Sequence, residues 1–151
     1  MHPVSIRSRL AIAALLAFAL AGLAQAKTVA IKGTPSLRFS VTQITAHPGE
    51  KLTIKLSNPT KMPASAMSHN WVLLKKGTDV GTFASKAMEA KSHGYIPPKM
   101  ADDVLAHTPL VKPGQTRSVT FHAPKRKGDY TYICSFPGHY AAGMKGTLVV
   151  K

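Results

Sequence analysis

Three side chains with metal-binding chemistry lie close together near the C-terminal end of the sequence. Cys134, the only cysteine, is followed by His139 five residues later and by Met144 after five more. A thiolate, an imidazole and a thioether on one loop form a soft donor set, which suits an ion that must be stable as both Cu(I) and Cu(II). A copper site with two imidazoles, one thiolate and a weak axial methionine needs a further histidine, and His69 is the candidate.

Each of these residues also has an ordinary structural interpretation. An isolated His69 is more often a hydrogen-bonded polar group than a ligand, Met144 alone is more often a core side chain, and a lone cysteine is commonly buried and inert. Together the residues favour a metal site, because one loop supplies three donors and a separate strand start supplies a fourth. A single thiol has no disulfide partner within the chain, and metal ligation is one reason to keep it.

The elements that must position these donors are almost all strands and turns. Alternating apolar and polar residues, bounded by glycine and proline turns, predict strands over residues 28–32, 37–44, 51–56, 69–74, 104–107, 116–122, 130–134 and 146–150. Phe83, Ala87 and Ala90 have helical spacing and predict one short helix over 81–93. We therefore expect an all-β, Greek-key β-sandwich of about eight strands with one short helical flap.

The first residues predict a targeting segment rather than part of the fold. A basic start with Arg7 and Arg9, an apolar run over 10–23 and an A-x-A site at 24–26 indicate a signal peptide over residues 1–26, too short in its apolar part to be a membrane span. We therefore expect a mature domain over residues 27–151 that is located in the periplasm and has no membrane span. An uncleaved anchor is the alternative interpretation.

The charge of the chain is strongly basic but diffuse. The formal net charge of +14 falls to +12 when Arg7 and Arg9 are removed with the signal peptide. The lysines are scattered, and the single basic run, Lys125 to Lys127, lies beside a predicted turn. This distribution argues against nucleic acid as a partner and favours acidic proteins.

Two stretches of the sequence resemble the azurins, which belong to the cupredoxins. They are residues 67–73, which read Met-Ser-His-Asn-Trp-Val-Leu, and residues 134–148, which hold the cysteine, histidine and methionine. The resemblance covers most of the mature chain and implies a cupredoxin β-sandwich with one type 1 (blue) copper per chain. It also implies that His69, Cys134 and His139 are equatorial ligands and that Met144 is the weak axial ligand.

The sequence departs from the azurin pattern in its ligand loops. Azurins usually have glycine before the first ligand histidine, where this chain has Ser68, so a weak contact from the carbonyl oxygen of Ser68 to the metal is left open. Four residues separate His139 from Met144, a spacing similar to that of auracyanins and plastocyanins. Asn70, next to the first ligand, is a candidate to tie the two ligand segments together; its alternative is a solvent-facing amide.

The expected function is that of a single-electron carrier rather than an enzyme. No carboxylate pair, nucleophile with a base or open metal position is apparent in the sequence. The expected partners of this monomer are redox proteins such as c-type cytochromes or respiratory and denitrification enzymes, with acidic surfaces. Electrons are expected to pass through an exposed apolar patch at Met67, Pro137, Gly138, Ala141 and Ala142. The alternative function is a periplasmic copper chaperone or storage protein.

Overall fold

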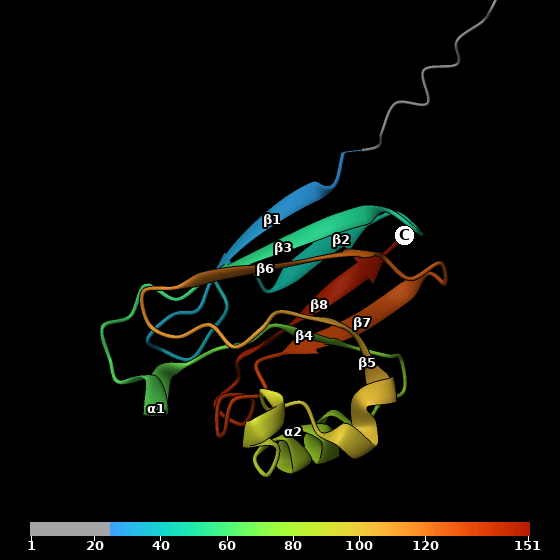
Figure 1. Ribbon diagram of the computed structural model, residues 1–151. Helices are drawn as coiled ribbons and strands as arrows, with labels where there is room; N and C mark the ends of the chain where they lie inside the picture. The colour runs from blue at the N-terminus through green and yellow to red at the C-terminus, as the bar shows by residue number, and fades with distance from the viewer. Residues whose placement is uncertain (1–24) are drawn as a thin grey trace, which may run out of the picture.

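The computed structural model describes residues 25–151, and in this part of the chain eight strands form two packed sheets (Figure 1). The three-stranded sheet has the order β1 (Lys27–Lys32), β3 (Lys51–Ser57) and β6 (Thr116–His122). The five-stranded sheet has the order β2 (Gln43–Ala46), β8 (Lys145–Val150), β7 (Gly128–Ile133), β4 (Val72–Leu74) and β5 (Val104–His107). The predicted all-β sandwich is confirmed. The predicted signal peptide falls, apart from its last two residues, outside the described part of the chain.

Apolar and polar residues alternate along β3, and this alternation gives the strand one buried face and one exposed face. Leu52, Ile54 and Leu56 are all fully buried, while Lys51 and Lys55 on the opposite face are exposed. Strand β3 pairs in parallel with β1 and antiparallel with β6, so its inward residues pack between two neighbours and against the second sheet. Full burial of one such aliphatic side chain stabilises the fold by about 1.5–3 kcal/mol.

Strand β4 differs from β3 because it is buried on both faces. Leu73 belongs to the main core between the sheets, together with Trp71 just before the strand. Val72 and Leu74 point to the other side and pack with Phe83 of the helical flap. The apolar run over residues 71–74 therefore contributes to two cores, and this packing fixes the chain just after the first predicted ligand.

The flap consists of α2 (Val80–Ala87) and two 3-10 helices, η1 (Lys91–His93) and η2 (Pro98–Asp103), and it lies against the outer face of the five-stranded sheet (Figure 1). The expectation of one helix over 81–93 is wrong in extent, since α2 ends at Ala87 and the chain continues as η1. No helix among residues 25–151 is both long and apolar enough to cross a bilayer.

Two further differences concern the segments next to the predicted ligands. Residues 37–44 are mostly a tight loop rather than a strand, because Leu37 adopts a positive φ of 56° and only β2 from Gln43 pairs with β8. A short helix that the sequence did not predict, α1 (Ala64–Met67), precedes Ser68. Both segments lie beside the candidate metal ligands described next.

Candidate metal centre

The loop over residues 134–144 joins β7 to β8 and is closed by its own backbone. The amide of Cys134 donates to the carbonyl of Met144 at 3.0 Å, and the amide of Met144 donates to the carbonyl of His139 at 2.9 Å. Gly138 and Gly143 have φ values of 80° and 102°, which glycine adopts without a steric penalty. Since both ends of the loop continue into paired strands, the three potential ligands are held at fixed places.

His69 is held by a separate part of the chain. It forms an isolated bridge with Val111, in which His69 N donates to Val111 O at 3.0 Å and Val111 N donates to His69 O at 2.7 Å. Asn58 adds a brace, because its Nδ2 donates to the carbonyls of Met67 and Val111. His69 is fully buried, so its backbone and ring are both fixed by packing.

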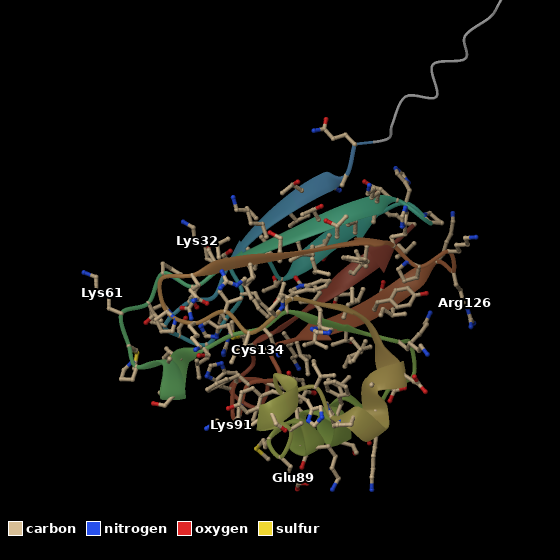
Figure 2. The ribbon with its side chains drawn as sticks, in the orientation of Figure 1. Lys32, Lys61, Glu89, Lys91, Arg126 and Cys134 are labelled. Atoms are coloured by element: carbon tan, nitrogen blue, oxygen red, sulfur yellow. The ribbon has the colours of Figure 1, made fainter. Side chains whose placement is uncertain are left out.

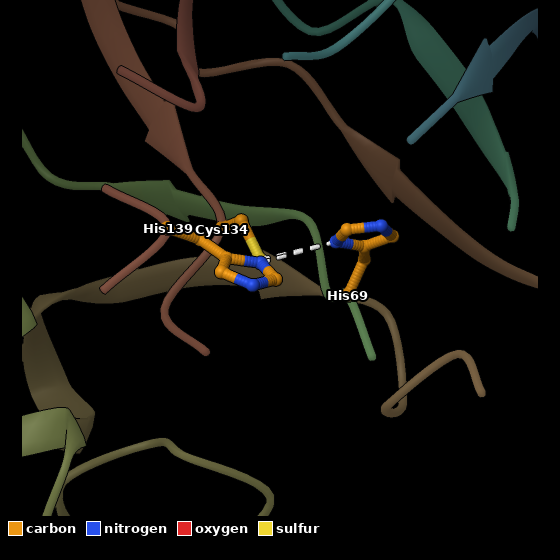
Figure 3. Close-up of side chains that lie close together, drawn as sticks. All are labelled: His69, Cys134 and His139. Atoms are coloured by element: carbon orange, nitrogen blue, oxygen red, sulfur yellow. Dashed lines mark hydrogen bonds between the residues drawn. The ribbon is translucent and has the colours of Figure 1, made fainter. Parts of the chain in front are cut away.

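Three donor atoms converge on one point between these segments (Figure 3). Nδ1 of His69 and Nδ1 of His139 lie 3.2 Å apart, and Sγ of Cys134 lies 4.0 Å from the first and 3.5 Å from the second. Metal–nitrogen bonds are about 2.0 Å long and metal–sulfur bonds about 2.3 Å. Two donor atoms bound to the same ion can therefore be at most about 4.1–4.4 Å apart. All three separations satisfy this limit, and two imidazoles with one thiol are donors that suit copper.

Burial keeps the two imidazoles neutral and therefore able to bind a metal. Desolvation, assisted by the nearby His139, lowers the pKa of His69 to about 4, and desolvation also lowers the pKa of His139. The same burial raises the pKa of the Cys134 thiol to about 12, while the backbone N–H groups of Asn70 and Phe136 at the sulfur act in the opposite direction. A metal cation must therefore displace the thiol proton, and the two N–H groups are in place to stabilise the resulting thiolate.

Met144 is fully buried at the end of the loop, and its backbone bonds place it next to both Cys134 and His139. Ser68 is also buried, and its Oγ donates to the carbonyl of Ala64 at 2.7 Å, which fixes the end of α1. The serine therefore has a clear structural role in the turn that leads into His69.

Asn70 connects the two ligand segments. Its Oδ1 accepts from the amide of Ser135 at 2.8 Å, and its Nδ2 donates to Oγ of Ser135 at 2.8 Å. The Ser135 hydroxyl in turn donates to the carbonyl of Tyr95 at 2.7 Å. Residues adjacent to His69 and Cys134 are thus joined directly to each other and to the flap.

The apolar surface near the site differs from the sequence-based expectation. Gly138, Ala141 and Ala142 are exposed and Pro137 is half-buried, but Met67 is only 5% exposed, so its expected place in an exposed patch is wrong. His139 is only 3% exposed, and its Nε2 lies 3.1 Å from the carbonyl of Ala66 in α1. Helix α1 covers the histidine because it folds back over the ligand loop.

Sequence reasoning missed two further neighbours of the site. Gly33 lies against the ring of His69, and a Cβ at Gly33 would lie 2.9 Å from Nε2 of that ring, too close without movement. Arg38 donates from Nη1 to the carbonyl of Ala142 in the ligand loop. Both residues are far from the ligands in sequence, and no local pattern points to either.

The chain is similar in sequence to known copper proteins. A family model described as copper binding proteins of the plastocyanin/azurin family matches residues 25–151. The chain is 39% identical to an azurin from Pseudomonas denitrificans over 128 residues, which cover 82% of this chain and 98% of that protein. It is 36% identical to auracyanin-B from Chloroflexus aurantiacus over 127 residues, 83% of this chain but 52% of the relative, so it spans about half the length of that protein.

The fold is similar to that of solved structures. One is auracyanin A from Chloroflexus aurantiacus, described as a blue copper protein, with a TM-score of 0.75 and 33% identity over 84% of this chain and 100% of that one. Another is auracyanin B, with a TM-score of 0.72 and 36% identity over 83% of this chain and 89% of that one. Sequence and fold therefore point to the same group of proteins.

Proposed function

Because the chain belongs to the plastocyanin/azurin family of copper-binding proteins, with copper as its cofactor, we propose that it carries single electrons between other redox proteins. The observation that carries this proposal is the convergence of three buried donors, His69, Cys134 and His139, within bonding reach of one ion. Bound copper supplies the one-electron Cu(II)/Cu(I) couple. Met144, which the backbone bonds hold beside Cys134 and His139, would complete the ligand set as a weak fourth donor.

The fixed ligand segments are what suit this centre to electron transfer. The loop over 134–144 is closed by its backbone bonds, and the Asn70–Ser135 pair joins it to the His69 segment. A site that is already formed rearranges little when the charge of the ion changes, and little rearrangement makes transfer fast. The burial of all three donors favours a carrier over a chaperone, because a chaperone must expose its ion to pass it on.

The surface charge and the N-terminal segment suggest where this carrier works. Basic side chains project outward at well-separated places, among them Lys32, Lys61, Lys91 and Arg126, while Cys134 lies inside (Figure 2). Such a diffuse positive field increases the rate of encounter with acidic partners. We propose that the protein is exported to the periplasm and exchanges electrons there with redox proteins that have acidic surfaces, such as c-type cytochromes or respiratory and denitrification enzymes.

The visible spectrum of the purified protein during titration with Cu(II) tests this function. We expect an intense thiolate-to-copper band that saturates at one copper per chain. The band should disappear on one-electron reduction and return on one-electron oxidation. Rapid transfer of the ion to a competing chelator, without such a band, would instead indicate a chaperone or storage protein.

Met144→Leu tests the axial position. We expect the variant to keep copper, because three strong donors remain, and to have a higher reduction potential, since loss of a donor destabilises Cu(II) more than Cu(I). A rise of about 60 mV corresponds to a tenfold change in the one-electron equilibrium. Potentiometric titration measures it, with Met88→Leu, a change at a half-exposed methionine just after α2, as the control. Loss of copper or an unchanged potential would show that Met144 is not the axial ligand.

A further inference from the structure

The loop over residues 33–40 contacts both ligand segments, although it is separated from the 134–144 loop by about a hundred residues of sequence. At its start, Gly33 packs against the ring of His69, where the absence of a side chain leaves room for the imidazole. Near its end, Arg38 contacts Ala142 and Gly143 of the ligand loop. This loop therefore spans the metal centre from one ligand segment to the other.

The loop over 33–40 is itself held in one conformation. Oγ1 of Thr34 accepts from the amide of Arg38 at 3.2 Å and donates to the carbonyl of Arg38 at 3.1 Å. Gly33 and Phe39 form an antiparallel bridge, and the ring of Phe39 packs against Tyr132 of β7 with centroids 5.6 Å apart. Leu37 adopts a positive φ of 56°, which a non-glycine residue keeps only where its surroundings hold it. The direction of the Arg38 side chain is thus set by the loop.

The guanidinium of Arg38 makes several contacts. Nη1 donates to the carbonyl of Leu37 at 2.9 Å and to the carbonyl of Ala142, and so bridges the two loops. The same group lies over Gly143, since a Cβ on this glycine would be 2.9 Å from Cζ of Arg38. Arginine suits this role because its planar group presents several N–H donors in fixed directions and is always charged.

We propose that Arg38 is a positioning residue of the copper centre. Its guanidinium binds the Ala142 carbonyl, in the four-residue segment between His139 and Met144, and so fixes the distance between these two ligands. It also places a permanent positive charge beside the ligand loop, which favours Cu(I) over Cu(II) and raises the reduction potential. This inference rests on the proposed function, because it assumes that copper is bound by the 134–144 loop.

The test compares three variants of the mature protein. Arg38→Met removes the charge and the hydrogen bonds, and Arg38→Lys keeps the charge without the planar guanidinium. The control, Arg117→Met, removes an equal charge from β6. Arg117 is exposed, and its guanidinium donates a hydrogen bond to the carbonyl of its own neighbour, Thr116. Two quantities are measured: the Cu(II)/Cu(I) equilibrium against a mediator at low salt, and amide hydrogen exchange over residues 138–144 in the copper-free protein.

We expect Arg38→Met to shift the equilibrium toward Cu(II) by about three- to tenfold and to speed exchange of the 138–144 amides. Arg38→Lys is expected to speed exchange with a smaller shift, and Arg117→Met to change neither quantity. If Arg38→Met does not fold, Arg38→Lys still tests the contact through hydrogen exchange. Arg38 variants that match Arg117→Met in both quantities, in a protein that shows the copper band, would overturn this proposal. Absence of the band in the unmodified protein would instead overturn the proposed function.

Discussion

Replacement of Cys134 by serine is expected to abolish the intense visible band completely while the β-sandwich stays folded. The band requires a sulfur-to-copper bond, and Cys134 is the only thiol in the chain. Two imidazoles and a hydroxyl remain within reach of the ion, so the variant is expected to bind Cu(II) more weakly and without strong colour. Absorption spectroscopy during Cu(II) titration measures both effects.

The fold of this variant can be checked independently of copper. Cys134 is fully buried, and a serine hydroxyl there is faced by the backbone N–H groups of Asn70 and Phe136, which can donate to it. We therefore expect the free energy of unfolding to fall by only about 1–3 kcal/mol, measured by denaturant titration of the copper-free protein. His122→Gln, at an exposed histidine of β6, is the matched control and should keep the band. A serine variant that stays intensely coloured would place the copper elsewhere.

The strands and the three donors could be predicted from the sequence because their signals are local. Leu52, Ile54 and Leu56 alternate with polar residues, and this period fixes the buried face of β3 without knowledge of the rest of the chain. Cys134 and His139 belong to one turn between two strands, and His69 begins an apolar run. The structure brings these three side chains together.

The remaining features depend on contacts between distant segments, which no local pattern encodes. Met67 looks like a surface residue beside a ligand loop, but α1 turns it inward and places the Ala66 carbonyl over His139. In the sequence, Gly33 resembles an ordinary turn glycine. Only the structure shows that the ring of His69 packs against it. The alternation in residues 37–44 predicts a strand, but the Thr34 hydrogen bonds close this segment into the loop that carries Arg38.

The burial of His139 changes the expected route of electrons. Because His139 is almost fully buried, we expect a partner to approach the exposed surface around it, formed by Ala66 on α1 and by Gly138 and Ala141 on the ligand loop. Beside this surface, a half-open pocket of about 250 Å³ lies between α2 and the ligand loop, lined by Ala84, Met88, Phe136, Gly138 and Ala141, among others. An apolar surface with a hollow lets a partner come close without removing water from charged groups. The contact can then be small, as it is in short-lived redox complexes.

Ala141→Glu is therefore expected to slow electron exchange with a redox partner by about tenfold or more, because the carboxylate would have to lose water in the contact or keep the partner away. Ala141 is a better site for this test than Ala142, because a glutamate at 142 would lie beside Arg38, which already bonds the backbone there. Stopped-flow kinetics with an acidic c-type cytochrome measures the effect. The visible spectrum should stay unchanged, since Ala141 is exposed and supplies no ligand atom.

Two controls separate close contact from long-range charge. Ala141→Gln adds nearly the same volume without charge and should slow exchange much less. Lys55→Glu changes the charge of the protein by two units on the exposed face of β3, away from the ligand loop, and should slow exchange mainly at low salt, because salt screens interactions beyond about 10 Å at 0.1 M. The effect of Ala141→Glu should persist at high salt, since a desolvated carboxylate in the contact is poorly screened. Equal effects of Ala141→Glu and Lys55→Glu at every salt concentration would show that the partner docks on another face of the sandwich.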